Sequence, residues 1–259
     1  MKEGKSYSLI NTARSALSTF ITVDSYCIGT HPLVKRFMRG VFCLNPPRPR
    51  YESTWDVSVV LNYLRTLAPV KGLSLRNLSY KLVMLLLLVT AQRKQTLMLL
   101  DTRNMILKHS SCTFVLSGLV KTARPTDPKR SLVIKSYAPD RRLCVMYAMR
   151  EYVRRTKKLR LLGKTQLLIS YQKPHNSITS QTLSRWIRTV MERSGIDTRV
   201  YKPHSTRSAA TSKAIGLKVP IEEVLKKGGW SNSLTFAKYY KKDIHNEDAF
   251  QDAVLQLTD

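Results

Sequence analysis

A histidine and an arginine stand three residues apart in the segment HSTRSAATSKAIG, residues 204–216. This spacing places His204 and Arg207 on one side of the first turn of a predicted helix. Free backbone amides and the helix dipole favour an anion there, and the imidazole and guanidinium add charge-assisted donors. The pair therefore suggests a phosphate-binding position. Taken alone, however, a capping histidine beside a solvated arginine is the more economical interpretation.

Two further cations occupy unusual settings. Arg93 follows the apolar run LVMLLLLV, residues 82–89, and precedes another apolar stretch. A charge embedded there needs a partner or a ligand, and Asp101 is the nearest acidic candidate for a buried ion pair. Lys121 comes just after a predicted strand, where a lysine is more often an exposed residue that protects the strand end.

Aromatic residues follow two glycines in the segment GGWSNSLTFAKYY, residues 228–240. The alternative to a functional site is that Trp230 belongs to the core and that the two tyrosines are amphipathic surface residues. Neighbours on a helix point about 100° apart, so only one of Tyr239 and Tyr240 can reach a given atom. Tyr240 shares a helical stripe with Phe236 and Ile244, which slightly favours it as the inward-facing tyrosine.

The charge balance points to a polyanionic partner. Lysine and arginine total 44 residues against 17 acidic residues, a formal net charge of +27. Such an excess costs self-repulsion in the folded state and is typical of proteins that bind nucleic acid. A protein that only coats nucleic acid is one alternative. An anionic membrane surface is a weaker one, because no basic amphipathic anchor stands out.

Cysteines and apolar runs exclude several classes. The four scattered cysteines have neither disulfide-framework nor zinc-ligand spacing, which favours a reducing compartment (Cys27, Cys43, Cys112 and Cys144). The first residues lack the apolar core of a signal peptide, so we do not expect secretion. The longest apolar run is too short to span a bilayer and predicts a buried helix.

Hydrophobic periodicity predicts a mainly α fold with a small antiparallel β-sheet, an α+β class. Helices are expected over 9–22, 31–42, 55–67, 73–100 (one or two), 141–160, 180–195, 204–216, 221–229 and 233–244. Strands are expected within 105–111, 112–120, 131–137 and 166–170. Three prolines within 45–51 predict an extended linker. We therefore expect a partial helical domain at 1–44, a linker at 45–52 and a larger domain at 53–259.

In this order, the candidate residues resemble the catalytic set of the tyrosine recombinases, the phage integrase family. That set comprises an arginine after a buried helix, a lysine in a β-turn, an HxxR pair, a histidine or tryptophan, and a tyrosine near the C-terminus. The resemblance implies these roles for Arg93, Lys121, His204, Arg207, Trp230 and either Tyr239 or Tyr240. It also implies a catalytic domain preceded by a core-binding domain, here with fewer helices than the usual four.

Most of the chain is also similar to the recombinases of DIRS-type eukaryotic retrotransposons, in motifs such as INTARSAL, PRPRY, TAQRKQTL and HSTRSAA. This resemblance implies a mobile-element enzyme that acts in the nucleus. Trp230 to Tyr239 is a nine-residue spacing seen in the wider family, whereas the DIRS-type relatives often read Phe-Tyr, which selects Tyr240. We favour Tyr240 by a small margin.

The resemblance implies DNA strand cleavage and rejoining through a 3′-phosphotyrosine, on double-stranded DNA and in a tetramer on two duplexes. Neither a metal nor a cofactor is required. The alternatives are an inactive, domesticated DNA-binding remnant and a topoisomerase of type IB that only relaxes DNA. The apolar tail residues Phe250, Val254 and Leu257 would dock on a neighbouring subunit or pack on their own core.

One departure from the family concerns the arginine after the buried helix. Many members carry an acidic residue three positions later, where this chain has Thr96. Another group must then orient Arg93, and Gln95 is the candidate that the sequence offers.

Overall fold

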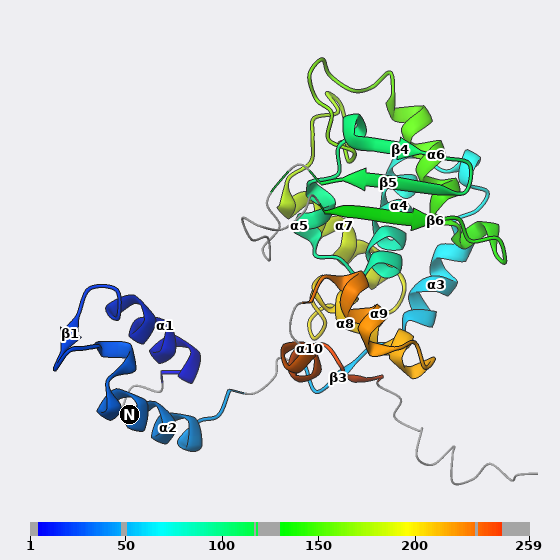
Figure 1. Cartoon of the computed structure of the whole chain (residues 1–259). Coiled ribbons are helices and arrows are strands. Elements are labelled where there is room, and N and C mark those ends of the chain that lie inside the picture. The colour runs from blue at the N-terminus through cyan, green and yellow to red at the C-terminus, as the bar shows by residue number, and fades with distance from the viewer. Residues whose placement is uncertain (1–4, 48–50, 117, 119–129, 231–232, 245–259) are drawn as a thin grey trace, which may run out of the picture. The chain divides into compact units, whose positions relative to one another are not determined.

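The computed structural model describes residues 5–47, 51–116, 118, 130–230 and 233–244. The chain divides into two compact units, residues 1–50 and residues 51–259 (Figure 1). The assignment of residues 1–44 to a core-binding domain and of residues 45–52 to a linker stays a prediction. In the described part of the chain, no helix combines the length and the apolar character needed to cross a membrane.

The smaller unit is a pair of helices with a short hairpin between them. Helix α1 spans Tyr7–Leu17 and helix α2 spans Pro32–Leu44. The hairpin pairs β1, Thr22–Val23, with β2, Tyr26–Cys27, in antiparallel fashion. The helix predicted to continue to residue 22 is therefore wrong after Leu17. Asp24 and Ser25, with φ of 48° and 67°, supply the left-handed pair that a tight two-residue hairpin turn requires.

The larger unit is mainly helical with small sheets, as the sequence predicts (Figure 1). Its helices are α3 Val57–Thr66, α4 Leu75–Thr90, α5 Lys94–Met98, α6 Val145–Thr156, α7 Ser180–Arg193, α8 Ser205–Gly216, α9 Ile221–Gly228 and α10 Ser233–Tyr239. Its strands are β3 Ser53–Thr54, β4 Met105–Leu107, β5 Ser111–Val115, β6 Ser131–Lys135 and β7 Asp243–Ile244.

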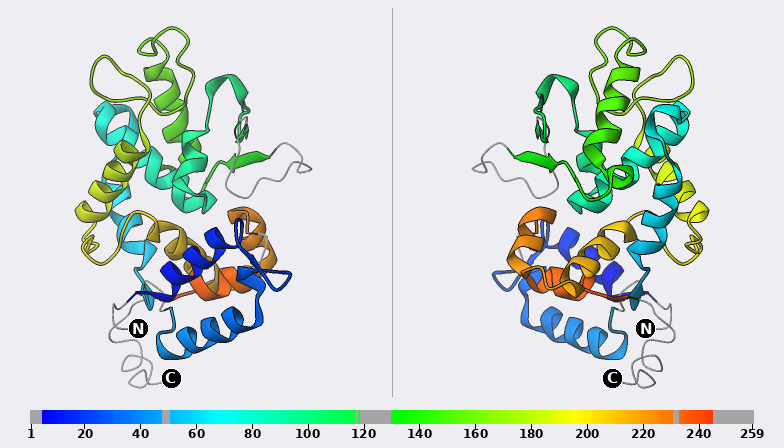
Figure 2. Two further views of the ribbon diagram at one scale, coloured as in Figure 1. Left: turned by 90° about the vertical axis from the view of Figure 1, so that its left-hand side faces the viewer. Right: turned by 90° about the vertical axis from the view of Figure 1, so that its right-hand side faces the viewer.

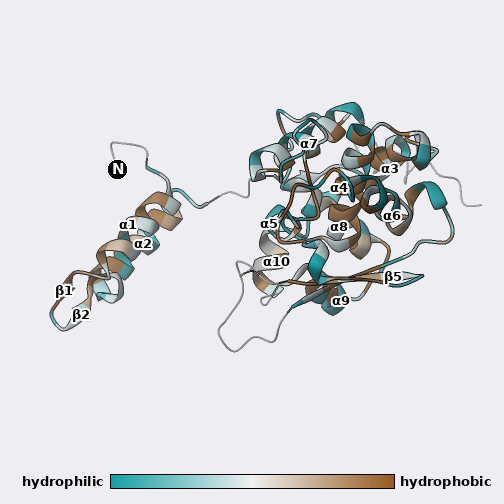
Figure 3. Ribbon diagram, turned by 90° about the horizontal axis from the view of Figure 1, so that it is seen from above, coloured by the Kyte–Doolittle hydropathy of each residue, from teal (hydrophilic) through white to brown (hydrophobic). Residues whose placement is uncertain are grey.

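Helix α4 forms the centre of the larger unit. Over residues 82–87 it is apolar on every side, and residues such as Leu82 and Leu86 have no exposed surface. A helix of this kind belongs in an interior, and α4 packs against α6, α7 and α8. Figure 3 shows its hydrophobic colouring among the surrounding helices. The predicted buried helix is thus confirmed, and its end delivers Arg93 to the edge of the core.

The three-stranded sheet covers one flank of this core. Strands β4, β5 and β6 pair antiparallel in that order. Alternate residues of β5 and β6, including Phe114 and Leu132, are buried, as expected for a sheet with one face on a core. Figure 2 shows the sheet from its side, with the helices of the larger unit on one face.

A second, two-stranded sheet joins the beginning of the larger unit to the far end of the described chain. Strand β3 pairs in parallel with β7, with Ser53 opposite Asp243 and Thr54 opposite Ile244. Directly after β3, the indole nitrogen of Trp55 donates to Oγ of Ser205 at 2.8 Å. The helix predicted over 233–244 is therefore wrong after Tyr239, because the chain there joins a strand.

Other boundaries also differ from expectation. The segment 166–170 forms isolated bridges to Asp101 and Ser177 in place of a strand. The helix predicted over 141–160 is shorter, spanning Val145–Thr156, because Asp140 first caps a turn of 3-10 helix at Arg141–Leu143.

Lys81 is a charged residue in the middle of the apolar helix α4. It has no exposed surface, and its ammonium group donates to the carbonyl oxygens of Leu64 at 2.8 Å and Leu67 at 2.6 Å. These carbonyls close the end of α3, so the lysine links α3 to α4. Burial lowers the pKa of Lys81 to about 8, although Asp140 acts in the opposite direction.

We predict that Lys81→Met changes how stability depends on pH. Because the folded pKa of Lys81 lies below the unfolded value of about 10.4, the unfolded chain binds more protons between pH ~8 and ~10.5. The wild type should therefore gain stability relative to Lys81→Met as the pH rises, by about 2 kcal/mol between pH ~7 and ~10. Denaturant unfolding of both proteins at each pH measures the difference. Parallel curves would contradict the assignment.

Candidate active site

Arg207 is the most deeply buried cation of the candidate site. It lies in the first turn of α8 and is 1% exposed. Its Nη2 donates to the carbonyl oxygen of Gly228 at 2.9 Å, whereas Nε and Nη1 have no hydrogen-bond partner among the described residues. Each unpaired buried donor costs about 1–3 kcal/mol. A buried guanidinium with two open donors is suited to bind an anion through charge-assisted hydrogen bonds.

The indole of Trp230 forms one wall of this position. The guanidinium carbon of Arg207 lies 3.5 Å from the centroid of the Trp230 ring, a close cation–π contact. Edge-on contacts at 4.8 Å join the same ring to Phe236 and to Tyr240. The Trp230 Nε1 is buried and, within the described part of the chain, has no hydrogen-bond partner. It is therefore a second kind of open donor beside Arg207.

The absence of a side chain at residue 228 allows Trp230 to approach Arg207. A Cβ at Gly228 would lie 1.8 Å from the Trp230 ring, and Gly228 also supplies the carbonyl that binds Arg207. Gly229 ends α9 with φ 72°, a left-handed conformation that favours glycine. The two glycines before the tryptophan thus have separate roles, one steric and one conformational.

Tyr240 lies against both Trp230 and the histidine of the HxxR pair. Its hydroxyl is 3.2 Å from Nε2 of His204, and the two rings meet edge-on at 5.8 Å. The Arg207 guanidinium carbon is 5.3 Å from the centroid of the Tyr240 ring. Phe236, fully buried one turn earlier, stacks on the Tyr240 ring at 6.4 Å. Phe236 and Tyr240 thus pack together as the predicted stripe requires, whereas Ile244, its third member, lies in strand β7.

Arg93 adds a second guanidinium. It is the residue directly before α5 and is half-buried. Burial is the main cause that lowers the pKa of Arg207 to about 9; the charge of Arg93 lowers it further, and Tyr240 opposes the shift. Arg207 remains a cation at neutral pH. Among the described residues, no acidic side chain pairs with either arginine, and Asp101, the predicted alternative partner of Arg93, binds Arg103 at 2.8 Å.

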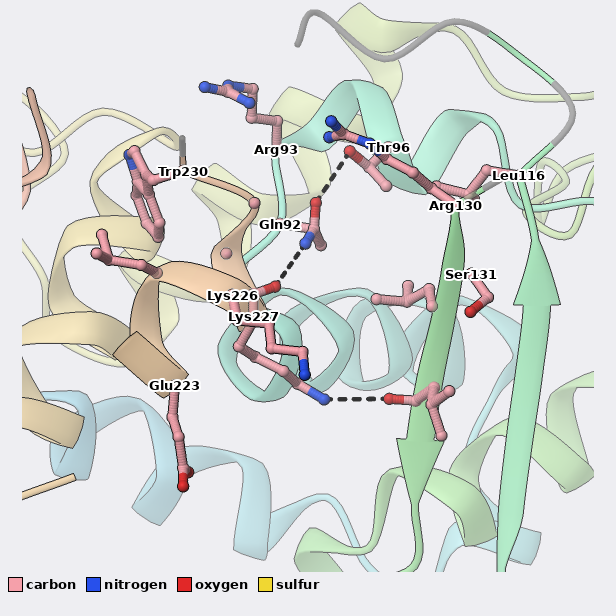
Figure 4. Close-up of a pocket in the computed structure, with 15 residues that line it drawn as sticks. Gln92, Arg93, Thr96, Leu116, Arg130, Ser131, Glu223, Lys226, Lys227 and Trp230 are labelled. Carbon is pink, nitrogen blue, oxygen red and sulfur yellow. Dashed lines mark hydrogen bonds between the residues drawn. The ribbon is translucent and has the colours of Figure 1, made fainter. Parts of the chain in front are cut away.

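Two pockets flank these residues. A cleft of about 780 Å³ runs between α9 and β6, with Arg93 and Trp230 on one wall and Arg130 on the other (Figure 4). A smaller pocket of about 180 Å³ includes Lys94, Ser184, Lys202, His204 and Arg207 in its lining. Gln92 borders both pockets. The described lining of the cleft includes four basic residues and one acidic residue, Glu223.

The predicted role of Gln95 beside Arg93 is wrong, because Gln95 is exposed and its side chain forms no hydrogen bond within the described chain. Gln92 is the glutamine that connects this segment to α9. The hydroxyl of Thr96 donates to Oε1 of Gln92 at 3.3 Å, and Nε2 of Gln92 donates to the carbonyl oxygen of Lys227 at 2.7 Å (Figure 4). The start of α5 is thereby tied to the last turn of α9, next to the carbonyl that binds Arg207.

The structure brings most of the predicted residues together. His204, Arg207, Trp230 and Tyr240 contact one another, and Arg93 borders the same cleft as Trp230. Other predictions lie outside the described residues (Lys121, the side chain of Tyr239, and the tail residues Phe250, Val254 and Leu257). The geometry thus supports the choice of Tyr240.

Sequence reasoning missed the residues that support the site. In the sequence, Gly228 was noted only as one of two glycines before Trp230, and no contact with the indole was assigned to it. Gln92, directly before Arg93, gave no signal of its own. Ser208 and Ser212 both contact the main chain of Tyr240, and only their four-residue spacing on α8 hinted at a shared face.

Comparison with known proteins agrees with the family resemblance of the sequence motifs. The model of the phage integrase family matches residues 60–246. None of the curated proteins matches the chain. Solved structures with a similar fold include the XerH site-specific recombinase bound to its difH substrate, at 10% identity and a TM-score of 0.54 over 97% of this chain and 71% of that one.

Two further structures are similar over most of their length. The XerA recombinase shares 14% identity at a TM-score of 0.56, over 98% of this chain and 83% of that one. The integrase of the Tn1549 transposon, in complex with circular intermediate DNA, shares 12% identity at a TM-score of 0.55, over 98% of this chain and 81% of that one. At such identities the likeness concerns the fold.

We predict that Gly228→Ala destabilises the protein by about 1–3 kcal/mol, because the added methyl group collides with the indole of Trp230. Gly216→Ala is the matched control, since a Cβ at Gly216, the last residue of α8, meets no atom within 4 Å. Denaturant unfolding should show the control to be as stable as the wild type or more so. Equal stability of the two variants would contradict the proposed steric role of residue 228.

We also predict that Arg207→Met removes an anion site without destabilising the free protein. The lowered pKa means that burying the charged guanidinium costs folding free energy at neutral pH, so its replacement by an apolar chain relieves that cost. Inorganic phosphate should raise the Tm of the wild type more than that of Arg207→Met. Thermal unfolding with increasing phosphate measures both effects. An identical phosphate response in the two proteins would exclude Arg207 from anion binding.

Proposed function

The chain belongs to the phage integrase family, the tyrosine recombinases, and we propose that it cleaves and rejoins double-stranded DNA through a covalent 3′-phosphotyrosyl intermediate. The larger unit has the fold of the tyrosine recombinase catalytic domain. The proposal rests above all on one observation: the hydroxyl of Tyr240 lies 3.2 Å from His204, beside a buried arginine with two open donors.

In the proposed reaction the Tyr240 oxygen attacks the phosphorus of a DNA phosphodiester. A bond forms between that oxygen and phosphorus, and the bond from phosphorus to the 5′-oxygen breaks. Nε2 of His204, 3.2 Å away, is placed to accept the phenolic proton. By the family resemblance, Lys121 donates a proton to the leaving 5′-oxygen. A 5′-hydroxyl of another strand then attacks the phosphotyrosine and reverses the step.

Charge stabilisation comes from the two guanidiniums. Negative charge grows on the non-bridging phosphate oxygens in the transition state, and preorganised cations in a buried site stabilise it strongly. Nε and Nη1 of Arg207 are open donors, the guanidinium carbon lies 5.3 Å from the Tyr240 ring centroid, and Arg93 adds a second positive charge near Arg207. The indole Nε1 of Trp230 is a further donor to the same phosphate.

The wider biological role is also a proposal. The net charge of +27 suits a DNA partner, and solved structures with this fold include an XerH complex with its substrate and a Tn1549 integrase complex with DNA. We propose that residues 1–44 act as a partial core-binding domain and that the protein works as a tetramer on two duplexes. The DIRS-type motifs are the basis for placing it in a mobile element and in the nucleus.

We predict that the wild-type protein forms a covalent adduct with a nicked duplex that loses a short 3′ fragment after cleavage. Denaturing gel electrophoresis would detect the adduct as a slower band. Tyr240→Phe should abolish it, whereas Tyr239→Phe should retain it. Arg207→Ala should also abolish the band while leaving most DNA binding intact. Loss of the adduct in Tyr239→Phe, but not in Tyr240→Phe, would identify Tyr239 as the nucleophile.

Assays of the wild-type protein also distinguish the alternative functions. Tight binding without an adduct by the wild type would identify a DNA-binding remnant that no longer cleaves. An adduct with relaxation of supercoiled DNA, but without joining to a second duplex, would identify a topoisomerase-like enzyme. Affinity should fall steeply with salt if phosphate contacts dominate. A shallow dependence would argue against the DNA proposal itself.

A further inference from the structure

The main chain of Tyr240 is held by two hydroxyl groups of α8. Oγ of Ser208 donates to the Tyr240 carbonyl oxygen at 3.0 Å, and Oγ of Ser212 donates to the same oxygen at 3.3 Å. The two serines lie four residues apart and thus on one face of the helix. Both are buried, with 6% and 5% of their surface exposed. One carbonyl therefore receives two donors from one rigid element.

Ser212 also binds the chain beyond the tyrosine. Its Oγ accepts a hydrogen bond from the backbone nitrogen of Lys242 at 3.0 Å. The single hydroxyl thus spans residues 240 and 242 and fixes the direction of the chain as it leaves α10. Two residues later, the pairing of β7 with β3 continues this restraint.

These contacts are not the usual ones for a hydroxyl in a helix. Serine and threonine side chains inside a helix commonly bond a carbonyl of the preceding turn. Thr211, between the two serines in sequence and equally buried, does so by donating to the Arg207 carbonyl at 2.9 Å. Ser208 and Ser212 instead reach across to another segment, so their hydroxyls are available for a role outside their own helix.

The same helix supports the groups that act on the tyrosine side chain. His204 directly precedes α8 and contacts the Tyr240 hydroxyl, and Arg207 lies beside its ring. Ser208 follows Arg207 without a gap. The acceptor of the phenolic proton, the phosphate-binding arginine and the main-chain supports of Tyr240 therefore share one rigid frame.

We propose that Ser208 and Ser212 are positioning residues that fix Tyr240 for attack on phosphorus. This inference rests on the proposed function and deepens it. Tyr240 follows directly on α10, a helix of only seven residues, so without these bonds its carbonyl would lose two anchors to α8. A displacement of the reacting atom by 1 Å can cost about a hundredfold in rate.

The test compares adduct formation on the nicked duplex in full-length variants, as single-turnover rates at saturating DNA. The double variant Ser208→Ala, Ser212→Ala should react about a hundredfold more slowly, with unchanged DNA affinity. Thr211→Val, which removes an equally buried hydroxyl of the same helix, should react like the wild type. Ser212→Thr retains the hydroxyl and should restore most of the rate lost in Ser212→Ala.

A second measurement does not depend on activity. Amide hydrogen exchange at Lys242 should become faster in Ser212→Ala than in the wild type or Thr211→Val, because the bond from its N–H is lost. If the double variant reacts as fast as Thr211→Val, or if exchange at Lys242 does not change, the inference is overturned. If the wild type forms no adduct while exchange responds as expected, the proposed function fails and the contacts stand.

Discussion

The site is organised around one buried cation. Arg207 is almost fully removed from solvent and donates one N–H group to the carbonyl of Gly228, and its guanidinium carbon lies 3.5 Å from the centre of the Trp230 ring. Such a charge is costly unless something in its surroundings compensates. The glycine pair, the tryptophan and the turn after α10 all take positions that accommodate it. The larger unit keeps the guanidinium of Arg207 buried and leaves two of its donor atoms without a hydrogen-bond partner among the described residues.

Helix α8 positions the residues that surround Arg207. It packs on the buried helix α4, so its position is set by the core of the larger unit. His204 precedes its first residue, Arg207 occupies its first turn, and Ser208 and Ser212 face the tyrosine segment. A second connection runs from the start of α5 through Gln92 to the end of α9. The candidate site residues come from several parts of the sequence, but their mutual placement depends on few elements.

The sequence predicted which residues meet at the candidate site better than it predicted the contacts that support them. Arg93, His204, Arg207, Trp230 and Tyr240 could be selected because each residue type has a definite task on a phosphate and because their order resembles a known family. The buried helix α4 was equally clear, since an apolar run without charges has no other stable place. The contacts that support the site depend on residues that are far apart in the sequence. That Gln92, and not Gln95, bridges to α9 depends on which side of a short helix meets a distant turn.

Local patterns also failed where pairing with a distant strand overrode them. Residues 240–244 continue a plausible helical stripe, yet the helix ends at Tyr239, and Asp243 and Ile244 enter a sheet with β3. No short window of sequence contains both partners. The hairpin after α1 was missed for a different reason: the left-handed φ of Ser25 is unusual for residues other than glycine, asparagine or aspartate.

The pairing of β3 with β7 has a consequence for the order of assembly. Its two strands stand at opposite ends of the larger unit in sequence, so the contact closes a very long loop and pays that entropy late in folding. The local contacts around α4 and the sheet carry no such cost and can form earlier. A partly folded chain would then hold Arg207 in α8 before Tyr240 is anchored to that helix. In that order, the proposed anion site forms before the proposed nucleophile is in place.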